Sequence, residues 1–166
     1  SIDFPKVMRP NRNYVITVNV KNSGTKPAGP FNVSLEVVGS YYEKKQVAGL
    51  NPGESALANF TVNLPEGCYE FIATADCDGD VEEDVEDNNQ ADDWYQVGYY
   101  IVVESNSDFE ELVNEGLATK VENTYYIQNL SITNCAGDGI FIKNTDVPFV
   151  IRNCTVHDCG WAPEKS

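Results

Sequence analysis

The sequence predicts an all-β chain: a β-sandwich over residues 1–103, a junction with a short capping helix over 104–122, and a truncated parallel β-helix of about two turns over 123–166. Two observations support this prediction. Apolar and polar residues alternate with a period of two in the first part, as in strands that bury one face. Near the end, a short segment repeats at a fixed offset, which is typical of a solenoid. An apolar fraction of 42% is sufficient for a core.

The predicted sandwich rests on four segments whose apolar residues point to one side. These residues are Tyr14, Ile16, Val18 and Val20; Phe31, Val33, Leu35 and Val37; Ala56, Ala58, Phe60, Val62 and Leu64; and Tyr69, Phe71, Ala73 and Ala75. Turn-forming residues separate the segments at 22–24 (Asn-Ser-Gly), 51–53 (Asn-Pro-Gly) and 65–67 (Pro-Glu-Gly). Short strands at this spacing predict an immunoglobulin-like sandwich of about seven strands.

The junction contains the only helical pattern that we identify in the sequence. Ser107 and Glu110 have the spacing of a capping box, and Phe109, Leu112 and Val113 then fall on one helical face. Gly116 supplies a stop signal. We expect a short amphipathic helix that either covers the open end of the β-structure or serves as a linker.

The repeat has an offset of 24 residues, since 151 − 127 = 24. It is set by four matching pairs: Ile127/Ile151, Asn129/Asn153, Ile132/Val156 and Cys135/Cys159. The unit is β-branched and interrupted by Asn and Gly, which favours one turn of a parallel β-helix for each repeat. We expect the Ile and Val pairs to point inward and the Asn pair to stack as an amide ladder at a bend.

Three segments of the first part resemble a known family. They are residues 16–24 (Ile-Thr-Val-Asn-Val-Lys-Asn-Ser-Gly), 49–55 (Gly-Leu-Asn-Pro-Gly-Glu-Ser) and 69–76 (Tyr-Glu-Phe-Ile-Ala-Thr-Ala-Asp) followed by 86–89 (Glu-Asp-Asn-Asn). In this order they are similar to the CARDB module, a cell-adhesion-related sandwich of bacterial and archaeal surface proteins. The later repeat resembles the right-handed parallel β-helices of archaeal surface proteins and carbohydrate-active proteins. Both resemblances imply an extracellular or cell-surface location.

The charge is strongly acidic. Eleven Lys and Arg face 26 Asp and Glu, a formal charge of −15, and ten of these acids lie between residues 76 and 93 without a base. Such a field disfavours nucleic acid and anionic lipid and favours cations or neutral partners. We find neither an apolar run that could cross a membrane nor a signal peptide, and we interpret both ends as cuts in a longer protein.

Alternating carboxylates in the acidic stretch are candidate Ca²⁺ ligands, because Ca²⁺ prefers oxygen donors. The candidates are Asp76, Asp78, Asp80, Glu82 and Asp84. The segment is not an EF-hand, since Val81 occupies the position that requires Gly. The alternative is a solvated hairpin loop between the last two sandwich strands, because charge runs are usually only solvated. We predict no other cofactor.

Modification sites follow from two motifs. Asn32 and Asn59 lie in Asn-x-Ser/Thr sequons and have the parity of the water-facing side, so both are glycosylation candidates. Sequons also occur at Asn129 and Asn153, but the expected ladder makes these positions unsuitable. Cys135 and Cys159 would lie on adjacent turns, where they form either a disulfide or a pair of stacked thiols.

Residues that could support catalysis are few. His157 lies beside Asp158, and Asp138 with Asp158 would be a carboxylate pair for glycoside hydrolysis near Arg152. These carboxylates fall at different positions of the turn, so we predict no catalytic residue and a protein that is not an enzyme. The predicted function is a surface or adhesion module that spaces or presents a β-helix domain. The alternative is the N-terminal cap of a β-helix protein that binds or cleaves polysaccharide.

Partners are expected to be other surface proteins or carbohydrate, without membrane insertion by this fragment. The last predicted strands, at Ile151 and Val156, leave backbone groups unpaired, and such an edge templates pairing with another chain. We therefore expect either a homodimer through the open end or a tail that folds Trp161 over it.

Overall fold

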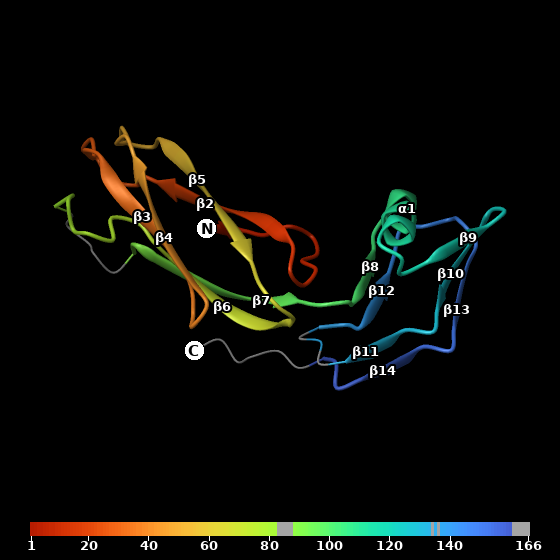
Figure 1. Ribbon diagram of the computed structural model, residues 1–166. Helices are drawn as coiled ribbons and strands as arrows, with labels where there is room; N and C mark the ends of the chain where they lie inside the picture. Colours follow the sequence, from red (N-terminus) through yellow and green to blue (C-terminus); the bar gives the residue numbers. More distant parts are fainter. Residues whose placement is uncertain (83–87, 134, 136, 161–166) are drawn as a thin grey trace. The chain divides into compact units, whose positions relative to one another are not determined.

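The computed structural model describes residues 1–82, 88–133, 135 and 137–160. The chain forms two compact units, the first comprising Ser1–Val97 and the second beginning at Gly98 (Figure 1). The predicted calcium ligand Asp84 and the tail residue Trp161 lie outside the described residues.

In its described residues, the first unit is an antiparallel sandwich of seven strands in two sheets. One sheet has the order β1-β2-β5, and the other has the order β4-β3-β6-β7. The strands are β1 (Ile2–Asp3), β2 (Asn13–Lys21), β3 (Phe31–Val37), β4 (Tyr41–Val47), β5 (Ser55–Asn63), β6 (Gly67–Thr74) and β7 (Gln90–Val97). The all-β class and the immunoglobulin-like sandwich are therefore confirmed.

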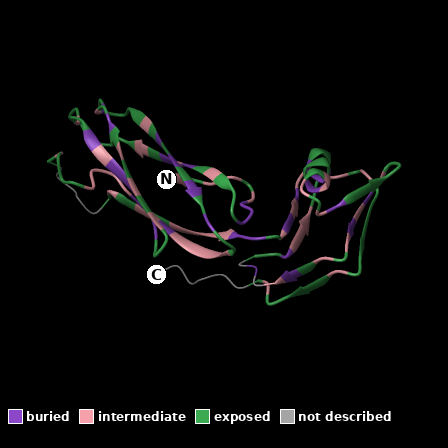
Figure 2. Ribbon diagram, in the orientation of Figure 1, coloured by how far each residue is buried: buried purple, intermediate pink, exposed green. Residues whose placement is uncertain are grey.

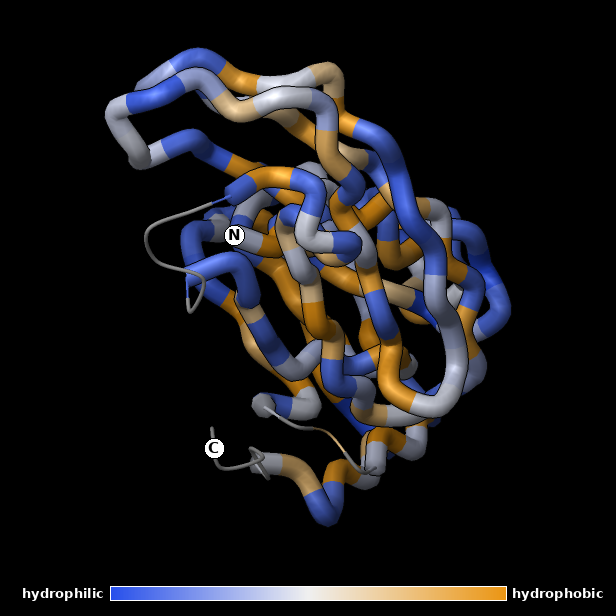
Figure 3. The backbone as a smooth tube through the Cα atoms, turned by 90° about the vertical axis from the view of Figure 1, so that its left-hand side faces the viewer, coloured by the Kyte–Doolittle hydropathy of each residue, from blue (hydrophilic) through white to orange (hydrophobic). Residues whose placement is uncertain are grey.

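The core of the sandwich includes residues that the alternation places inward, together with Met8, Leu50 and Val97. On β3, Phe31, Val33, Leu35 and Val37 are each at most 5% exposed, and Phe60 on β5 is fully buried. Hydrophobic and hydrophilic stretches alternate along much of the backbone in Figure 3. Burial of one apolar face of each sheet against the other is the main stabilising interaction, at about 25 cal/mol for each Å² of apolar surface.

The predicted turns after β2 and before β5 are closed by local hydrogen bonds, and each connects strands of different sheets. The Asn22 side-chain oxygen accepts the Gly24 N–H at 2.9 Å, and the Asn51 carbonyl accepts the Glu54 N–H at 3.0 Å. Gly53 has a φ of 81°, a left-handed conformation that only glycine adopts readily. The turn residues therefore fix where β2 ends and β5 begins.

The described part of the second unit contains three parallel strand pairs. They are β8 (Ile101–Val103) with β12 (Ile140–Ile142), β10 (Thr124–Gln128) with β13 (Phe149–Arg152), and β11 (Ser131–Thr133) with β14 (Thr155–His157). A short strand, β9 (Thr119–Val121), pairs antiparallel with β10. The three pairs lie on three sides of one buried cluster, which includes Ile101, Ile127 and Ile132 (Figure 1).

The 24-residue repeat corresponds to a real strand register. Ile127 pairs with Ile151, and Ile132 pairs with Val156. The third pair has a longer offset, from 101 to 140, because helix α1 (Asn106–Asn114) and β9 are inserted between β8 and β10. Parallel strands require a crossover connection, and the chain makes it by going round the unit once.

Asn129 and Asn153 lie at equivalent bends after β10 and β13. Both have left-handed backbones, with φ values of 58° and 52°, which Asn tolerates better than most residues. The Asn153 side-chain nitrogen is 3.5 Å from the Asn129 side-chain oxygen, a long polar contact of the kind expected for the ladder.

The predicted sandwich range of 1–103 includes a strand that pairs elsewhere. Ile101–Val103 forms β8, whose hydrogen-bonding partner is β12 of the second unit. The apolar segment after β7 has the residue types of one more sandwich strand. Its pairing partner lies 39 residues later in the chain, since 140 − 101 = 39.

The predicted helix forms, but its capping box is shifted. Helix α1 begins after the N-cap Ser105, and Asp108 takes the third helical position. The Asp108 carboxylate accepts the N–H groups of Glu104 at 2.6 Å and Ser105 at 2.9 Å. Ser107 and Glu110 were therefore the wrong pair, because the helix starts two residues earlier and Asp replaces Glu in the motif.

The predicted apolar face and the predicted stop of the helix agree with the structure. Phe109 and Leu112 are buried in the second unit, with Phe109 stacked on Tyr125 at a centroid distance of 4.9 Å. Gly116, with a φ of 77°, donates its N–H to the Val113 carbonyl just past the helix end.

Candidate functional site

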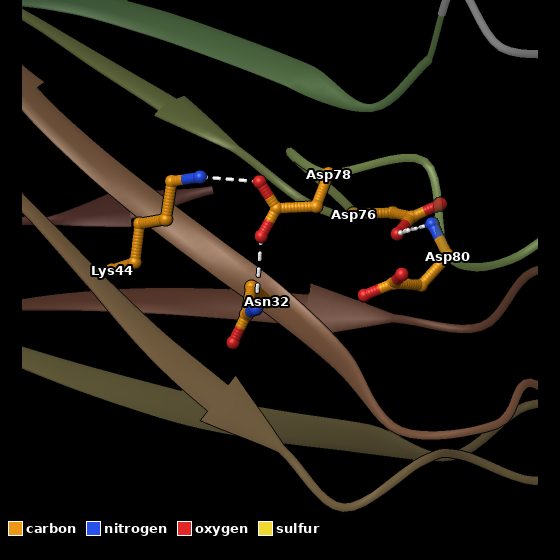
Figure 4. Close-up of polar contacts among 5 residues, drawn as sticks. All are labelled: Asn32, Lys44, Asp76, Asp78 and Asp80. Atoms are coloured by element: carbon orange, nitrogen blue, oxygen red, sulfur yellow. Dashed lines mark hydrogen bonds and ion pairs between the residues drawn. The ribbon is translucent and has the colours of Figure 1, made fainter.

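The acidic loop after β6 begins with a carboxylate that organises the loop itself. Asp76 has a left-handed φ of 47°, and one of its carboxylate oxygens accepts the N–H of Asp80 at 2.8 Å (Figure 4). The other carboxylate oxygen accepts the N–H of Val81 at 3.0 Å. Short Asp side chains commonly bond to the backbone in turns. The Asp76 carboxylate is thus engaged in holding the loop conformation.

The second acid of the loop binds the neighbouring strands. Asp78 forms an ion pair with Lys44 of β4 and accepts a hydrogen bond of 2.9 Å from the side chain of Asn32 on β3 (Figure 4). The Lys44 ammonium, and then the Asn32 amide, lower the pKa of the Asp78 carboxyl. The hydrogen bond with Asp78 in turn raises the pKa of Lys44.

The predicted calcium ligands are only partly brought together. Asp80 and Glu82 are exposed, whereas Asp76 and Asp78 are engaged in the contacts above. Across the described part of the chain, no three His, Cys, Asp or Glu side chains are grouped so that they could hold a metal ion. Because Asp84 is not described, calcium binding stays a prediction.

Lys44 is the residue of this site that the sequence did not indicate. It lies on the outward face of β4, directly opposite Ser34 of β3, and is separated from Asp78 by 34 residues. Alternation within residues 41–47 could have placed Lys44 on the outer face. The pairing with Asp78 depends on how the loop folds back over β3.

The two glycosylation candidates have different surroundings. Asn59 is exposed on β5, and its side-chain oxygen accepts the Thr17 hydroxyl at 2.9 Å. The Asn32 side-chain nitrogen, the atom that a glycan would modify, donates to Asp78. Asn59 is consequently the more accessible acceptor, and glycosylation of either residue stays a prediction.

Cys135 and Cys159 carry thiols in this structure and lie at equivalent positions of the repeat. Cys135 is buried, and Cys159 is half-buried. Each sulfur lies near the carbonyl oxygen two residues earlier, at 3.8 Å from Thr133 and 3.5 Å from His157. The thiols therefore share one orientation, which fits stacking, and the disulfide alternative stays a prediction.

The residues considered for catalysis make local contacts. His157 Nδ1 is 2.8 Å from the carboxylate of the adjacent Asp158. Arg152 donates to the Gln128 side chain at 2.7 Å and lies over the Tyr126 ring at 5.0 Å. Asp138 is exposed before β12. The Arg152 contacts join β13 to β10, whereas the His157 contact is with the next residue in the chain.

No helix among the described residues is long and apolar enough to cross a membrane. The one described helix, α1, has 9 residues.

The comparisons with known proteins concern the sandwich. The family model for CARDB matches residues 1–93. A crystal structure of the CARDB domain of a Pyrococcus furiosus protein, in complex with di-metal ions, is 31% identical with a TM-score of 0.53, and covers 58% of this chain and 88% of that chain. A search of curated proteins finds no match.

A second solved structure extends the comparison to another organism. It is the solution structure of a domain from a predicted cell surface protein of Methanosarcina acetivorans, 27% identical with a TM-score of 0.52. It covers 58% of this chain and 86% of that chain.

Proposed function

Because the chain belongs to the CARDB family through residues 1–93, we propose that it is a non-enzymatic module of an extracellular surface protein. In this proposal the sandwich spaces or presents the parallel strands that follow it. The observation that carries the proposal is the direct succession of the two units, with β7 ending at Val97 and β8 beginning at Ile101. A short connection of this kind suits a spacer better than a long flexible linker would.

The second unit is proposed to be the start of a parallel β-helix. Support comes from its three parallel strand pairs and from the constant offset of 24 residues in two of them. A β-helix stacks turns that cannot bury their apolar face alone, so each turn stabilises its neighbour. Its role in the surface protein would be to form an elongated, presented domain.

An extracellular location is proposed by analogy with the Methanosarcina relative, which is described as a predicted cell surface protein. The expected partners are other surface proteins or carbohydrate. The formal charge of −15 disfavours nucleic acid, because phosphate groups would be repelled.

Divalent-cation binding at the acidic loop is also part of the proposal. The Pyrococcus domain is described in complex with di-metal ions. In this chain Asp80 and Glu82 present exposed carboxylates, and cation binding would relieve repulsion within the acidic stretch.

Labelling of intact cells of the source organism tests the surface location. Antibodies raised against the 166-residue chain should label intact cells. This labelling should disappear after brief treatment of the cells with protease. Labelling that requires permeabilised cells would contradict the proposal, because the antigen would then lie inside the cell boundary.

The alternative function is a cap of a polysaccharide-binding or polysaccharide-cleaving protein. An assay of the chain itself distinguishes cleavage from the proposed non-enzymatic role. Incubation with a panel of neutral and acidic polysaccharides should release no reducing ends. Measurable release that disappears in the Asp138→Asn or Asp158→Asn variant would favour the alternative.

A further inference from the structure

The four-stranded sheet β4-β3-β6-β7 has an outer face on the side away from the sandwich core. Successive side chains of a strand point to opposite faces, and on β4 every second residue is exposed (Figure 2). Several outward side chains are aromatic or aliphatic. Tyr42 and Val38 are 58% and 46% exposed, and Ile72 and Trp94 are half-buried. The outer face thus presents two aromatic rings to its surroundings.

A glutamate stands directly opposite each of these two rings. Glu36 of β3 pairs with Tyr42 of β4, and Glu70 of β6 pairs with Trp94 of β7. Directly opposite residues of antiparallel strands have Cβ atoms about 4.5–5.5 Å apart. Each ring therefore has a carboxylate beside it on the same face.

The outer face also has an excess of negative charge. Besides the two glutamates, Asp92 of β7 points outward, directly opposite Ile72 of β6. Among the outward positions of the four strands, the one base is Lys44, and its ammonium is paired with Asp78. Aromatic rings beside carboxylates attract cations, so the chemistry of this face is complementary to a basic partner.

The second unit shows the same combination of groups with a cation bound. Lys120 forms an ion pair with Glu110, and its ammonium lies 4.8 Å from the centroid of the Tyr125 ring. Lysine or arginine also lies over aromatic rings elsewhere in the chain. Within the described ranges, no such cation lies over Tyr42 or Trp94. These two rings and their glutamates therefore have the makeup of a cation site that the described residues do not fill.

The distance between the two rings indicates the size of the partner. Tyr42 aligns across the sheet with Asp92, three strand spacings away, and Trp94 is two residues further along β7. At ~4.8 Å for each spacing and ~3.3 Å for each residue, the two positions are roughly 16 Å apart. In an extended peptide, two residues four positions apart point to the same side and are roughly 13 Å apart, and the long stem of a lysine covers the remainder.

We propose that the outer face of β4-β3-β6-β7 binds an extended basic segment of another protein, with one Lys or Arg at Tyr42 and Glu36 and a second at Trp94 and Glu70. A polypeptide suits this face better than an amino-sugar polymer, because Ile72 lies between the two sites and favours the aliphatic stems of such side chains. The inference rests on the proposed surface role for the origin of the partner. Binding in solution is measured without cells, so its failure is distinct from a failure of surface labelling.

Titration of the 166-residue chain with the capped peptide Lys-Ser-Thr-Ser-Lys, followed by backbone amide chemical shifts, tests the proposal. We expect a weak complex at low salt, with a Kd on the order of 1 mM, because the cation contacts are exposed. Amides of β3, β4, β6 and β7 should shift and saturate, while those of β2 and β5, in the other sheet, should not. This measurement on the wild-type chain decides the question even where a variant does not fold.

Two pairs of variants separate this face from the general charge of the chain. Tyr42→Ser should weaken binding about 2- to 5-fold, and Tyr99→Ser should not, since Tyr99 is 50% exposed but lies outside the sheet. Glu36→Gln should weaken binding, whereas Glu66→Gln, which removes the same charge from an exposed turn before β6, should have little effect.

Three results would overturn the proposal. Shifts that do not saturate on this face by about 10 mM peptide would exclude the site. Equal effects of Glu36→Gln and Glu66→Gln would reduce the attraction to net charge. Tighter binding of a glucosamine oligomer than of the peptide, lost in Tyr42→Ser, would make the occupant an amino-sugar polymer.

Discussion

Ile127 and Ile151 are direct partners in the parallel pairing of β10 with β13, and only the first of them is buried. Ile127 is fully buried, and Ile151 is 43% exposed. The two residues occupy the same position in consecutive repeats, so the difference arises from what lies on the outer side of each strand. Among the described residues, β10 lies between β13 and β9, whereas β13 is an outer strand of the sheet.

Gly139 is predicted to be essential for packing in the second unit. A Cβ atom at this position would lie 2.5 Å from Val156 Cγ1 and 3.0 Å from Cys159 Sγ. Gly139→Ala should therefore destabilise the second unit by about 1–3 kcal/mol, the usual cost of overpacking. Chemical denaturation followed by the far-UV signal measures this change.

Gly137→Ala provides the control for this prediction, since a Cβ there meets nothing within 4 Å. Its effect should stay within about 0.5 kcal/mol. Equal effects of the two substitutions would show that Gly139 does not pack against Val156 as described.

The ion pair between Lys44 and Asp78 is predicted to stabilise the sandwich in a pH-dependent way. The pKa of Asp78 is lowered from 3.8 by Lys44 and Asn32, so its stabilisation is present above that ordinary value and is lost as pH falls through the lowered pKa. A double-mutant cycle of Lys44→Met and Asp78→Asn should give a favourable coupling at about pH 7 that weakens as the pH falls below 3.8. A coupling that does not weaken at low pH would contradict the ion pair.

Calcium is predicted to stabilise the sandwich through the acidic loop. At a concentration 100-fold above the dissociation constant, a ligand of the native state adds about 2.7 kcal/mol, which raises the melting temperature of a domain of this size by several degrees. Asp80→Asn should reduce the increase, and Glu66→Gln, in the turn before β6, should not.

Sodium chloride at matched ionic strength is the salt control for this measurement. An equal increase with either salt would reduce the calcium effect to charge screening.

Residues 1–97 are predicted to fold without the second unit. They contain all seven sandwich strands and a continuous core. Expressed alone, they should melt cooperatively, and extension to residue 103 should shift the melting temperature by less than about 2 °C, because β8 has its partner in the second unit. A segment 1–97 that melts without cooperativity, next to a segment 1–103 that melts sharply, would assign β8 to the sandwich.

Local sequence patterns predict the sandwich well because burial of one face imposes a strict period on each strand. The inward residues of β3, such as Phe31 and Leu35, are buried as expected. The strand β4 has a weaker signal, because Lys44 and Gln46 face water beside one buried Val47. Its place is fixed by pairing with β3 rather than by its own composition.

Long-range partners are the part that local patterns do not determine. Ile101–Val103 has the residue types of a sandwich strand but pairs with β12. Asp78 lies in a segment typical of metal ligands and forms an ion pair with Lys44. The 24-residue repeat is the exception, because residue types that recur at a fixed offset predict the strand register directly.

Backbone nuclear Overhauser effects test the parallel register of β10 and β13. The structure predicts contacts between residues i and i + 24 in four successive pairs, from Tyr125 with Phe149 to Gln128 with Arg152. The opposite order, with Tyr125 next to Arg152 and Gln128 next to Phe149, would indicate antiparallel pairing. It would contradict the parallel pairing of β10 with β13.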